Sequence, residues 1–395
     1  MEKKNVMTKV ALLFSGSTYN INVVVFGVAI GAISTNFSAT STQLSQITNL
    51  PALFMIPAVL ISAKLAEKFS KKDILVVAWI LFMASGFVAS ASTSIEMLLV
   101  SRAFTGFAIG LISSIPRAMI AQLYPQEIGQ LNGFQTSCTA AVSFISSLVA
   151  GGLAAISWKY PIYLFFLGIV FLVLILIFIP RVPAEKKEYA EEKKEKKPFG
   201  AMVWLTVLSG TFMFMLFVPI QTKLTLVILK GGFGDSVVAG YARAFLTIGS
   251  VVGGIFFAAL AKKNKKAVLI LALTLATVSY YFLSTTANLY VLFGSILISG
   301  MSTLGMTLPW FGSTIAQSVD RSRVTMLLST YTILNYLSQF LTTYIVAGME
   351  KIAGNSNPTT ALFGVTICLL ISLIVVIAIF YIVPKKSTAT TGVSN

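Results

Sequence analysis

The chain has 395 residues, of which 56% are hydrophobic and only 11% charged, so it has too few charges to cover the surface of a water-soluble protein of this size. It contains no His, which excludes a Ser–His–Asp triad and a His metal site, and its cysteines, Cys138 and Cys368, lie too far apart for a metal cluster. The net charge of +16 comes from short clusters between apolar runs, not from one basic domain, which argues against nucleic-acid binding.

Twelve apolar runs are long enough to cross a bilayer, since about 20 helical residues span its core of about 30 Å. Backbone groups in lipid must be paired internally, so these runs are predicted to be helices. The first six runs cover 10–33, 44–65, 74–92, 97–122, 131–156 and 161–181. The second six cover 200–228, 237–261, 267–286, 290–317, 324–348 and 358–383. The sequence therefore predicts an all-α membrane protein with 12 transmembrane helices.

The distribution of Lys and Arg predicts which ends of the spans face the cytoplasm. If the N-terminus is cytoplasmic, 22 of the 29 Lys and Arg lie on the cytoplasmic side, namely before the first span, in alternate loops and in the C-terminal tail. The loops on the other side hold only Lys159, Lys230 and Lys351. We expect a multi-pass protein of the cell membrane with both termini cytoplasmic. This asymmetry also accounts for most of the net charge.

One polar stretch, 183–198, is rich in Glu and Lys and ends at Pro198, which predicts a charged cytoplasmic linker. It separates a six-helix half, 1–182, from a second six-helix half, 199–395. Similar basic sequences follow the second and eighth spans, at 65–72 and 260–266, so the halves carry a weak internal repeat. Two similar halves are typical of secondary transporters, whose substrate site lies between them near mid-membrane.

Three motifs resemble the major facilitator superfamily. The stretch Ala63-Lys64-Leu65-Ala66-Glu67-Lys68-Phe69-Ser70-Lys71-Lys72 resembles the family's loop 2–3 motif, Gly-x-Leu-Ala-Asp-Arg-x-Gly-Arg-Arg. Leu98-x-x-x-Arg102-x-x-Thr105-Gly106 resembles its fourth-helix motif, Leu-x-x-x-Arg-x-x-Gln-Gly. Gly151-Gly152 with Trp158-Lys159 resembles the end of its fifth helix, although Ser147-Leu148 stands where the family's antiporters have Gly-Pro. The resemblance implies two six-helix halves related by a pseudo-two-fold axis, with helices 1, 4, 7 and 10 around a central cavity.

The resemblance also implies coupling or gating roles for Glu67, Lys71 and Lys72 in the loop motif. It places Glu67 near the start of the eleventh helix, where a carboxylate favours the positive helix end and latches the outward-facing state. The alternative for Glu67 is a surface charge among lysines. Arg102 is implied to lie in the protein interior and to act in coupling or packing within the N-terminal half.

Four cations remain within the predicted spans, namely Arg102, Arg117, Lys223 and Arg243. All thirteen acids, by contrast, fall at predicted span ends or in loops, so no acidic partner is expected at mid-membrane. A buried cation must then be satisfied by polar neighbours, by water or by a substrate anion. We hypothesise an electropositive cavity that binds a negatively charged group. The alternative for Lys223 and Arg243 is that their side chains reach the outer interface.

Polar and aromatic residues complete the expected substrate site. In addition to Arg117, Lys223 and Arg243, it comprises Asn20, Asn22, Gln221, Trp310, Tyr331, Asn335 and Gln339. The alternatives for these residues are interhelical hydrogen bonds and anchoring at the membrane interface. No catalytic residue, metal site or cofactor is expected. The lack of His and of a carboxylate within the spans favours uniport or anion exchange over proton coupling.

The sequence therefore predicts a secondary active or facilitative transporter, not an enzyme, which moves a small organic solute by alternating access. Its charges favour an organic anion (carboxylate) exchanger or symporter. The alternative is a multidrug or sugar efflux transporter of the same fold, and a membrane enzyme or a channel is the rival from another class. The expected partners are a small-molecule substrate and the lipid bilayer, without nucleic acid, and the protein is expected to be a monomer.

Overall fold

The computed structural model describes residues 2–17, 20–181, 198–355 and 357–382. Within these ranges the chain forms helices and short connections, without a β-strand. The predicted linker 183–198 lies, apart from Pro198, outside the described residues. The predicted all-α fold is confirmed.

The helices of the N-terminal part follow the first six predicted spans. They are α1 (Glu2–Ser15), α2 (Ile21–Phe37), α3 (Ser41–Lys68), α4 (Lys71–Ser90), α5 (Ile95–Leu123), the 3₁₀ turn η2 (Pro125–Glu127), α6 (Ile128–Ile156), the 3₁₀ segment η3 (Tyr160–Leu167) and α7 (Gly168–Phe178). The predicted span 10–33 is broken, because α1 ends at Ser15 and α2 begins at Ile21. The span predicted at 161–181 is formed by η3 and α7 together.

The helices of the C-terminal part follow the other six. They are α8 (Ala201–Lys230), α9 (Ser236–Leu260), α10 (Lys265–Thr285), α11 (Leu289–Gly300), the π-helical segment η4 (Met301–Thr307), α12 (Leu308–Gln317), α13 (Arg321–Ile352), α14 (Pro358–Ile377) and the π-helical segment η5 (Ala378–Ile382). The span predicted at 290–317 is a continuous run of α11, η4 and α12. Helix α13 extends past the predicted end of its span at residue 348.

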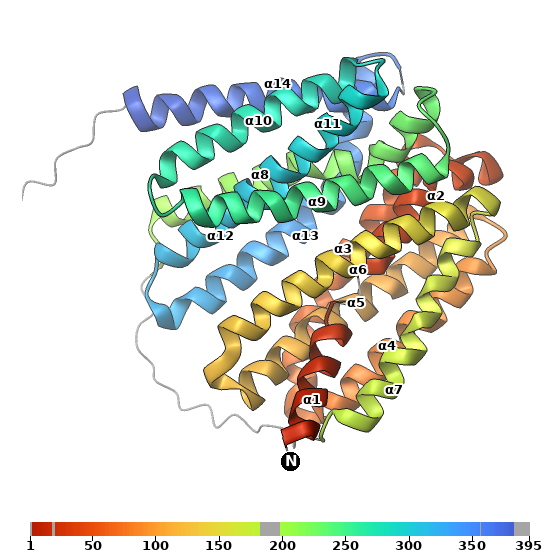
Figure 1. The fold of residues 1–395 in the computed structure, drawn as a ribbon, viewed down its shortest axis with the longest axis vertical. Coiled ribbons are helices and arrows are strands. Elements are labelled where there is room, and N and C mark those ends of the chain that lie inside the picture. Colours follow the sequence, from red (N-terminus) through yellow and green to blue (C-terminus); the bar gives the residue numbers. More distant parts are fainter. Residues whose placement is uncertain (1, 18–19, 182–197, 356, 383–395) are drawn as a thin grey trace, which may run out of the picture.

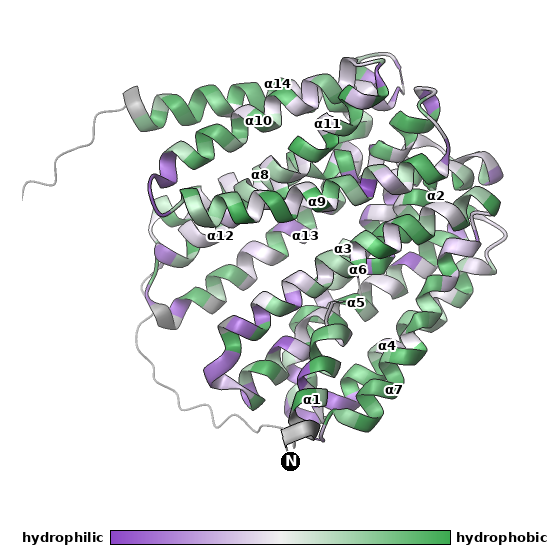
Figure 2. Cartoon of the chain, in the orientation of Figure 1, coloured by the Kyte–Doolittle hydropathy of each residue, from purple (hydrophilic) through white to green (hydrophobic). Residues whose placement is uncertain are grey.

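The outer faces of these helices are apolar, as the membrane assignment requires. Helix α14, for example, exposes Ile367, Leu370, Ile371, Ile374 and Val375. Figure 2 shows helices that are hydrophobic along most of their length, with hydrophilic residues gathered near their ends. Ten helices in the described part of the chain are long and apolar enough to cross a membrane. The predicted spans 10–33 and 324–348 are not among these ten, so the count of twelve stays a prediction.

The buried core consists mainly of two hydrophobic clusters. One contains residues between Ala11 and Ile179 together with Leu226, and the other contains residues between Val207 and Leu369. Each cluster, apart from Leu226, falls within one of the predicted halves. The domain boundary itself stays a prediction, because it lies in the part of the chain that is not described.

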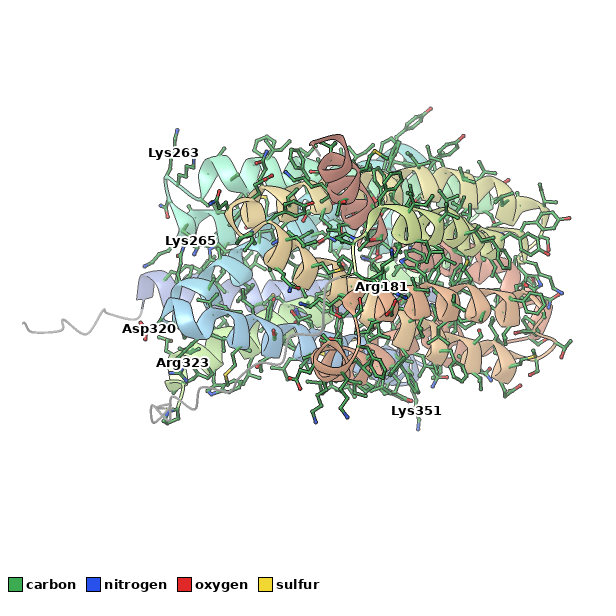
Figure 3. All side chains as sticks on the ribbon, turned by 90° about the horizontal axis from the view of Figure 1, so that it is seen from below. Arg181, Lys263, Lys265, Asp320, Arg323 and Lys351 are labelled. Carbon is green, nitrogen blue, oxygen red and sulfur yellow. The ribbon has the colours of Figure 1, made fainter. Side chains whose placement is uncertain are left out.

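The two halves meet toward one face of the molecule and separate toward the other. We call the end that carries the start of α1 and the α3–α4 turn the N-terminal face, and the end that carries the α2–α3 and α13–α14 turns the far face. Figure 1 shows that α6 and α9 approach each other toward the Ile156 and Ser236 ends and diverge toward Ile128 and Leu260. In Figure 3 the charged side chains of Lys263, Lys265, Asp320 and Arg323 gather at one end of the molecule, the N-terminal face, whereas Lys351 lies away from them.

Glycines allow the close approach of α6 and α9 near the far face. A Cβ atom added to Gly240 would lie 2.6 Å from the Ser147 carbonyl oxygen and 2.9 Å from the Gly151 Cα. A side chain at Gly152, by contrast, would meet no atom within 4 Å. The close contact between the halves therefore depends on Gly240, which lies against Gly151, and not on Gly152.

We predict that Gly240→Ala lowers the thermal unfolding midpoint of the detergent-solubilised protein, because the added methyl group meets backbone atoms that cannot move without separating the helices. The expected cost is about 1–3 kcal/mol, as for other overpacked contacts. Gly152→Ala is the matched control and is expected to leave the midpoint unchanged or to raise it slightly. Equal midpoints for the two variants would contradict this account of the α6–α9 contact.

Candidate functional site

A cavity of about 500 Å³ lies between the two halves. Residues of α2, α3, α5 and α6 line it on the N-terminal side, and residues of α8, α9, η4 and α13 line it on the other. Its volume lies within the range of about 300–1,000 Å³ that small-molecule sites occupy. The cavity is therefore the candidate substrate site.

Six of the predicted site residues line this cavity, and they come from both halves. They are Asn20, Asn22, Arg117, Gln221, Arg243 and Gln339. Asp and Glu are absent from the described residues that line the cavity, so Arg117 and Arg243 give it a net positive charge.

Arg243 on α9 is the most enclosed cation of the cavity wall, with 4% of its surface exposed. Its Nη2 donates to the Gln221 carbonyl oxygen at 2.6 Å, and its Nε has no hydrogen-bond partner among the described atoms. The guanidinium lies against Gly27 of α2, where an added Cβ atom would be 2.3 Å from the Arg243 Cζ. The Gly27 carbonyl oxygen accepts a hydrogen bond of 2.6 Å from Thr225 of α8. Because Gly27 has no side chain, the Arg243 guanidinium fits where α2, α8 and α9 meet.

The N-terminal half contributes a second arginine and two asparagines to the cavity wall. Arg117 is exposed, and its Nε donates to Gln135 Oε1 at 3.3 Å. Asn20 Nδ2 donates to Ser143 Oγ at 2.6 Å, while the buried Asn22 Oδ1 lacks a partner among the described atoms. A solute in the cavity therefore meets one exposed guanidinium, one buried guanidinium and several amides.

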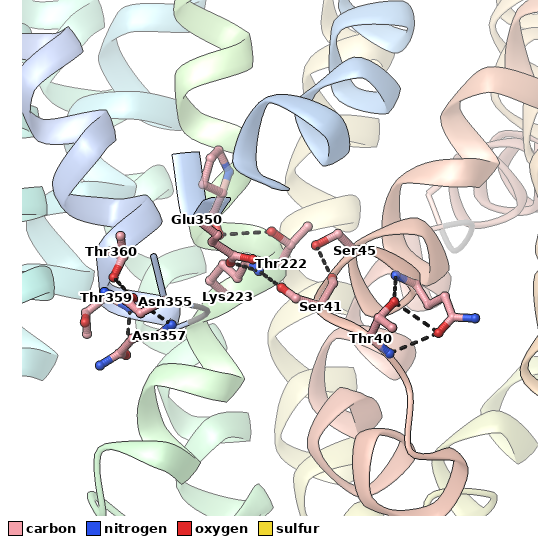
Figure 4. Close-up of polar contacts among 12 residues, drawn as sticks. Thr40, Ser41, Ser45, Thr222, Lys223, Glu350, Asn355, Asn357, Thr359 and Thr360 are labelled. Atoms are coloured by element: carbon pink, nitrogen blue, oxygen red, sulfur yellow. Dashed lines mark hydrogen bonds and ion pairs between the residues drawn. The ribbon is translucent and has the colours of Figure 1, made fainter. Parts of the chain in front are cut away.

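The structure contradicts two expectations about Lys223, its place in the cavity wall and its lack of an acidic partner. This residue does not line the cavity, and it does have an acidic partner, because its Nζ lies 2.6 Å from Glu350 Oε1 on α13. The side chains of Lys223 and Glu350 are 1% and 6% exposed. The Lys223 ammonium also donates to Ser41 Oγ, at the start of α3, at 2.7 Å (Figure 4). Glu350 was expected in a loop, but α13 continues to Ile352 and so carries this carboxylate inward toward α8.

Three other predicted site residues also lie outside the cavity lining. Trp310 donates its indole N–H to the Lys265 carbonyl oxygen at 2.7 Å and packs against Phe311. Tyr331 is 7% exposed and packs near Gly210 of α8. Asn335 shares a helical face with Gln339, but only the latter reaches the cavity, one turn nearer the far face. Trp310, Tyr331 and Asn335 thus do not line the cavity in this structure, and their part in substrate binding stays a prediction.

Arg102 is fully buried among α2, α3 and α5, away from the cavity. Its Nε donates to the Ile47 carbonyl oxygen at 2.8 Å, and its guanidinium lies 3.9 Å from the centre of the Phe26 ring. Its two terminal nitrogens have no hydrogen-bond partner among the described atoms. This position agrees with the interior location that the resemblance implies, while a role in coupling stays a prediction.

The residues of the loop 2–3 motif contact their own half at the N-terminal face. Lys71 donates to Gln122, and Lys72 Nζ donates to the Leu176 carbonyl oxygen at 2.8 Å. Glu67 makes no ion pair or hydrogen bond with any described residue. The implied latch of Glu67 therefore shows no contact among the described side chains, and its role stays a prediction.

Sequence reasoning missed several residues at the contact between the halves. Asn49 lines the cavity, and its Nδ2 donates to Thr343 Oγ1 on α13 at 3.1 Å. Nearby, Gln46 Nε2 donates to Tyr344 Oη at 3.3 Å. Hydroxyl and amide residues are common in apolar helices, so little in the sequence distinguished these from their neighbours. Glu350 could have been found, because a helix that extends by one turn makes it part of α13, where it faces Lys223 of α8.

Comparisons with known proteins agree with this architecture. The sequence profile of the Major Facilitator Superfamily matches residues 11–343. The chain is 25% identical over 213 residues to the uncharacterized transporter YebQ of Escherichia coli (strain K12), an alignment that covers 52% of this chain and 46% of that protein. It is 22% identical over 199 residues to the arabinose-proton symporter of the same organism, covering 49% and 42% of the two chains. The alignments thus span less than half the length of these curated relatives.

Solved structures show the same fold at low sequence identity. The D-xylose-proton symporter superposes with a TM-score of 0.79 at 15% identity, covering 96% of this chain and 98% of that one. An inward-open structure of the xylose transporter XylE from E. coli has a TM-score of 0.73 at 16% identity, covering 96% and 97%. An inward-facing, occupied structure of a bacterial homologue of the human lysosomal transporter Spinster also has a TM-score of 0.73, at 17% identity and 95% coverage of both chains.

We predict that Gly27→Ala destabilises the protein mainly through Arg243, because its new methyl group would occupy the place of the guanidinium. The single substitution is expected to lower the free energy of unfolding by about 1–3 kcal/mol. In an Arg243→Gln background the same substitution should cost less, with a coupling energy of about 0.5–3 kcal/mol. Unfolding midpoints of the four proteins in detergent measure this cycle, and strictly additive effects would refute the contact.

Proposed function

Because the chain belongs to the Major Facilitator Superfamily, whose members carry small solutes across membranes, we propose that its central cavity binds a small organic anion such as a carboxylate. The observation that carries this proposal is the pair of arginines, Arg117 and Arg243, in a cavity lined by no acid among the described residues. A guanidinium presents a planar set of N–H donors that matches the two oxygens of a carboxylate.

Arg243 supports the proposal further through its burial. A guanidinium that is 4% exposed and has no acidic partner among the described residues is costly unless an anion or water compensates it. Its Nε has no hydrogen-bond partner among the described atoms, so the group retains donor capacity. A carboxylate that enters the cavity would supply both the negative charge and the missing acceptor.

Transport follows from opening the cavity to each face in turn. In the present arrangement, contacts between the halves lie toward the far face, at Asn49–Thr343 and Gln46–Tyr344. Solute therefore exchanges at the N-terminal face, which the distribution of Lys and Arg predicts to be cytoplasmic. We propose that the protein acts in the cell membrane, as a monomer, through closure of the N-terminal face and opening of the far face.

A sugar is the second candidate substrate, in keeping with the predicted alternative of sugar efflux. Five amide side chains, Asn20, Asn22, Asn49, Gln221 and Gln339, line the cavity, and amides form hydrogen bonds with hydroxyl groups. The names of the arabinose and xylose symporters also favour a sugar. A sugar would leave the two arginines without a counter-charge, which is why the anion is placed first.

We predict that Arg243→Gln and Arg117→Gln each strongly slow anion counterflow in proteoliposomes loaded with a panel of mono- and dicarboxylates. Loss of one charge-assisted interaction of about 1.5–3 kcal/mol corresponds to roughly a tenfold to hundredfold lower rate at subsaturating solute. Lys263→Gln, which removes one exposed cation at the N-terminal face, is the matched control and should transport normally. Counterflow of a neutral sugar that survives in both arginine variants, without carboxylate transport by the parent protein, would overturn the anion assignment.

A further inference from the structure

A smaller pocket of about 280 Å³ lies between the two halves at the far face. The α2–α3 region contributes Ser34, Ser38 and Ser41 to its wall, and helix α8 of the other half contributes Lys223 and Lys230. The described residues that line this pocket include no acid, so two positive charges face it. It shares no lining residue with the central cavity, so it is a separate candidate site.

Lys223 is the buried charged group of this pocket. Its side chain is 1% exposed, and its ammonium contacts Glu350 Oε1 at 2.6 Å and donates to Ser41 Oγ at 2.7 Å (Figure 4). Glu350 lines a neighbouring pocket and not this one. Because an ammonium group has three N–H donors, Lys223 retains one donor beyond these two contacts.

The start of α3 adds two further donors to the pocket. Ser41 is the first residue of this 28-residue helix, so its backbone N–H has no acceptor within the helix. The Thr40 side chain caps the N–H of Gln43, two residues further on. The Ser41 hydroxyl accepts from Lys223 and therefore keeps its own hydrogen for another acceptor. The positive end of the helix dipole lies at the same place.

We propose that this far-face pocket is a second anion site, which binds a small oxyanion such as inorganic phosphate or a carboxylate. Lys223 and Lys230 supply the positive charge, and the hydroxyl and backbone N–H of Ser41 supply directed hydrogen bonds. An oxyanion suits this arrangement because it presents several negatively charged oxygens, each of which can accept from a different donor. The site is distinct from the proposed substrate site at Arg117 and Arg243.

The bound anion stabilises the closed far face, because its ligands come from both halves. Ser41 belongs to α3, whereas Lys223 and Lys230 belong to α8, and the hydrogen bond from Lys223 to Ser41 crosses between the halves. Opening the far face separates these groups and dismantles the site. A ligand that binds one of two conformations shifts the equilibrium toward it. Anions on the far side therefore slow the opening of that side.

The test measures opening of the far face and needs no transported solute. In a Cys138→Ser, Cys368→Ser background, Ala140→Cys places a thiol in the cavity wall, and Ala287→Cys places a reference thiol on the exposed turn after α10. A membrane-impermeant thiol reagent is added from the far side at constant pH. Sodium phosphate or acetate replaces a bulky sulfonate salt at equal ionic strength, and the ratio of the two labelling rates is recorded.

The labelling ratio of the parent protein is expected to fall along a saturable curve as phosphate or acetate rises. The decrease reaches about tenfold at an anion concentration of about ten times the dissociation constant. Lys230→Gln should raise the half-effect concentration up to about fivefold, as expected for an exposed charge, and Lys230→Arg should restore it. The half-effect concentrations of the two anions in the parent protein show whether the site prefers inorganic phosphate or a carboxylate.

Lys351→Gln is the matched control, because Lys351 is also an exposed lysine in the last turn of a far-face helix but lines the neighbouring pocket. Its response to anions should equal that of the parent protein. The thermal unfolding midpoint in detergent is a second measurement, since an anion that binds the folded protein raises it, and Lys230→Gln should reduce this rise.

The proposal is overturned if neither anion changes the labelling ratio or the unfolding midpoint of the parent protein. It is also overturned if Lys230→Gln and Lys351→Gln respond alike, because the effect is then general screening of charge. Loss of the response in Arg243→Gln would instead assign it to the central cavity. A normal anion response alongside failed carboxylate counterflow would overturn the proposed substrate class alone.

Discussion

A charge buried among apolar helices must be paired, hydrated or neutralised by a ligand, and this constraint connects most features of the molecule. The four cations within the spans meet it in four ways. Lys223 is paired with Glu350, and Arg117 is exposed to the cavity. Arg102 donates to the Ile47 carbonyl oxygen and stacks on the Phe26 ring. Arg243 alone is both buried and short of acceptors while it borders the central cavity, which makes it the group that a substrate anion would complete.

The contact between the halves combines this constraint with close packing. Near the far face, Gly240 allows backbones to touch, Asn49 and Thr343 share a hydrogen bond, and Lys223 reaches Ser41. A contact built only from apolar surface would close tightly in lipid without an obvious means of release. Polar groups can exchange these hydrogen bonds for hydrogen bonds to water, so the contact can open without leaving them unsatisfied, as alternating access requires.

The spans could be predicted from the sequence because the length of an apolar run is fixed by the thickness of the bilayer. The cavity helices and six of the expected site residues followed from the resemblance and from the rarity of polar groups in the spans. The failures have one physical cause, since residue type does not reveal the direction in which a helix face points or the turn at which it ends. One further turn of α13 makes Glu350 the partner of Lys223, and the faces of α12 and α13 direct Trp310 and Tyr331 toward packing contacts.

The position of Glu350 also changes the argument about energetics. Without a carboxylate inside the spans, uniport or exchange of anions was the simpler expectation. Glu350 pairs with Lys223, whose ammonium also donates to Ser41 on the opposite half, so the expected lack of a carboxylate among the helices no longer argues against proton coupling.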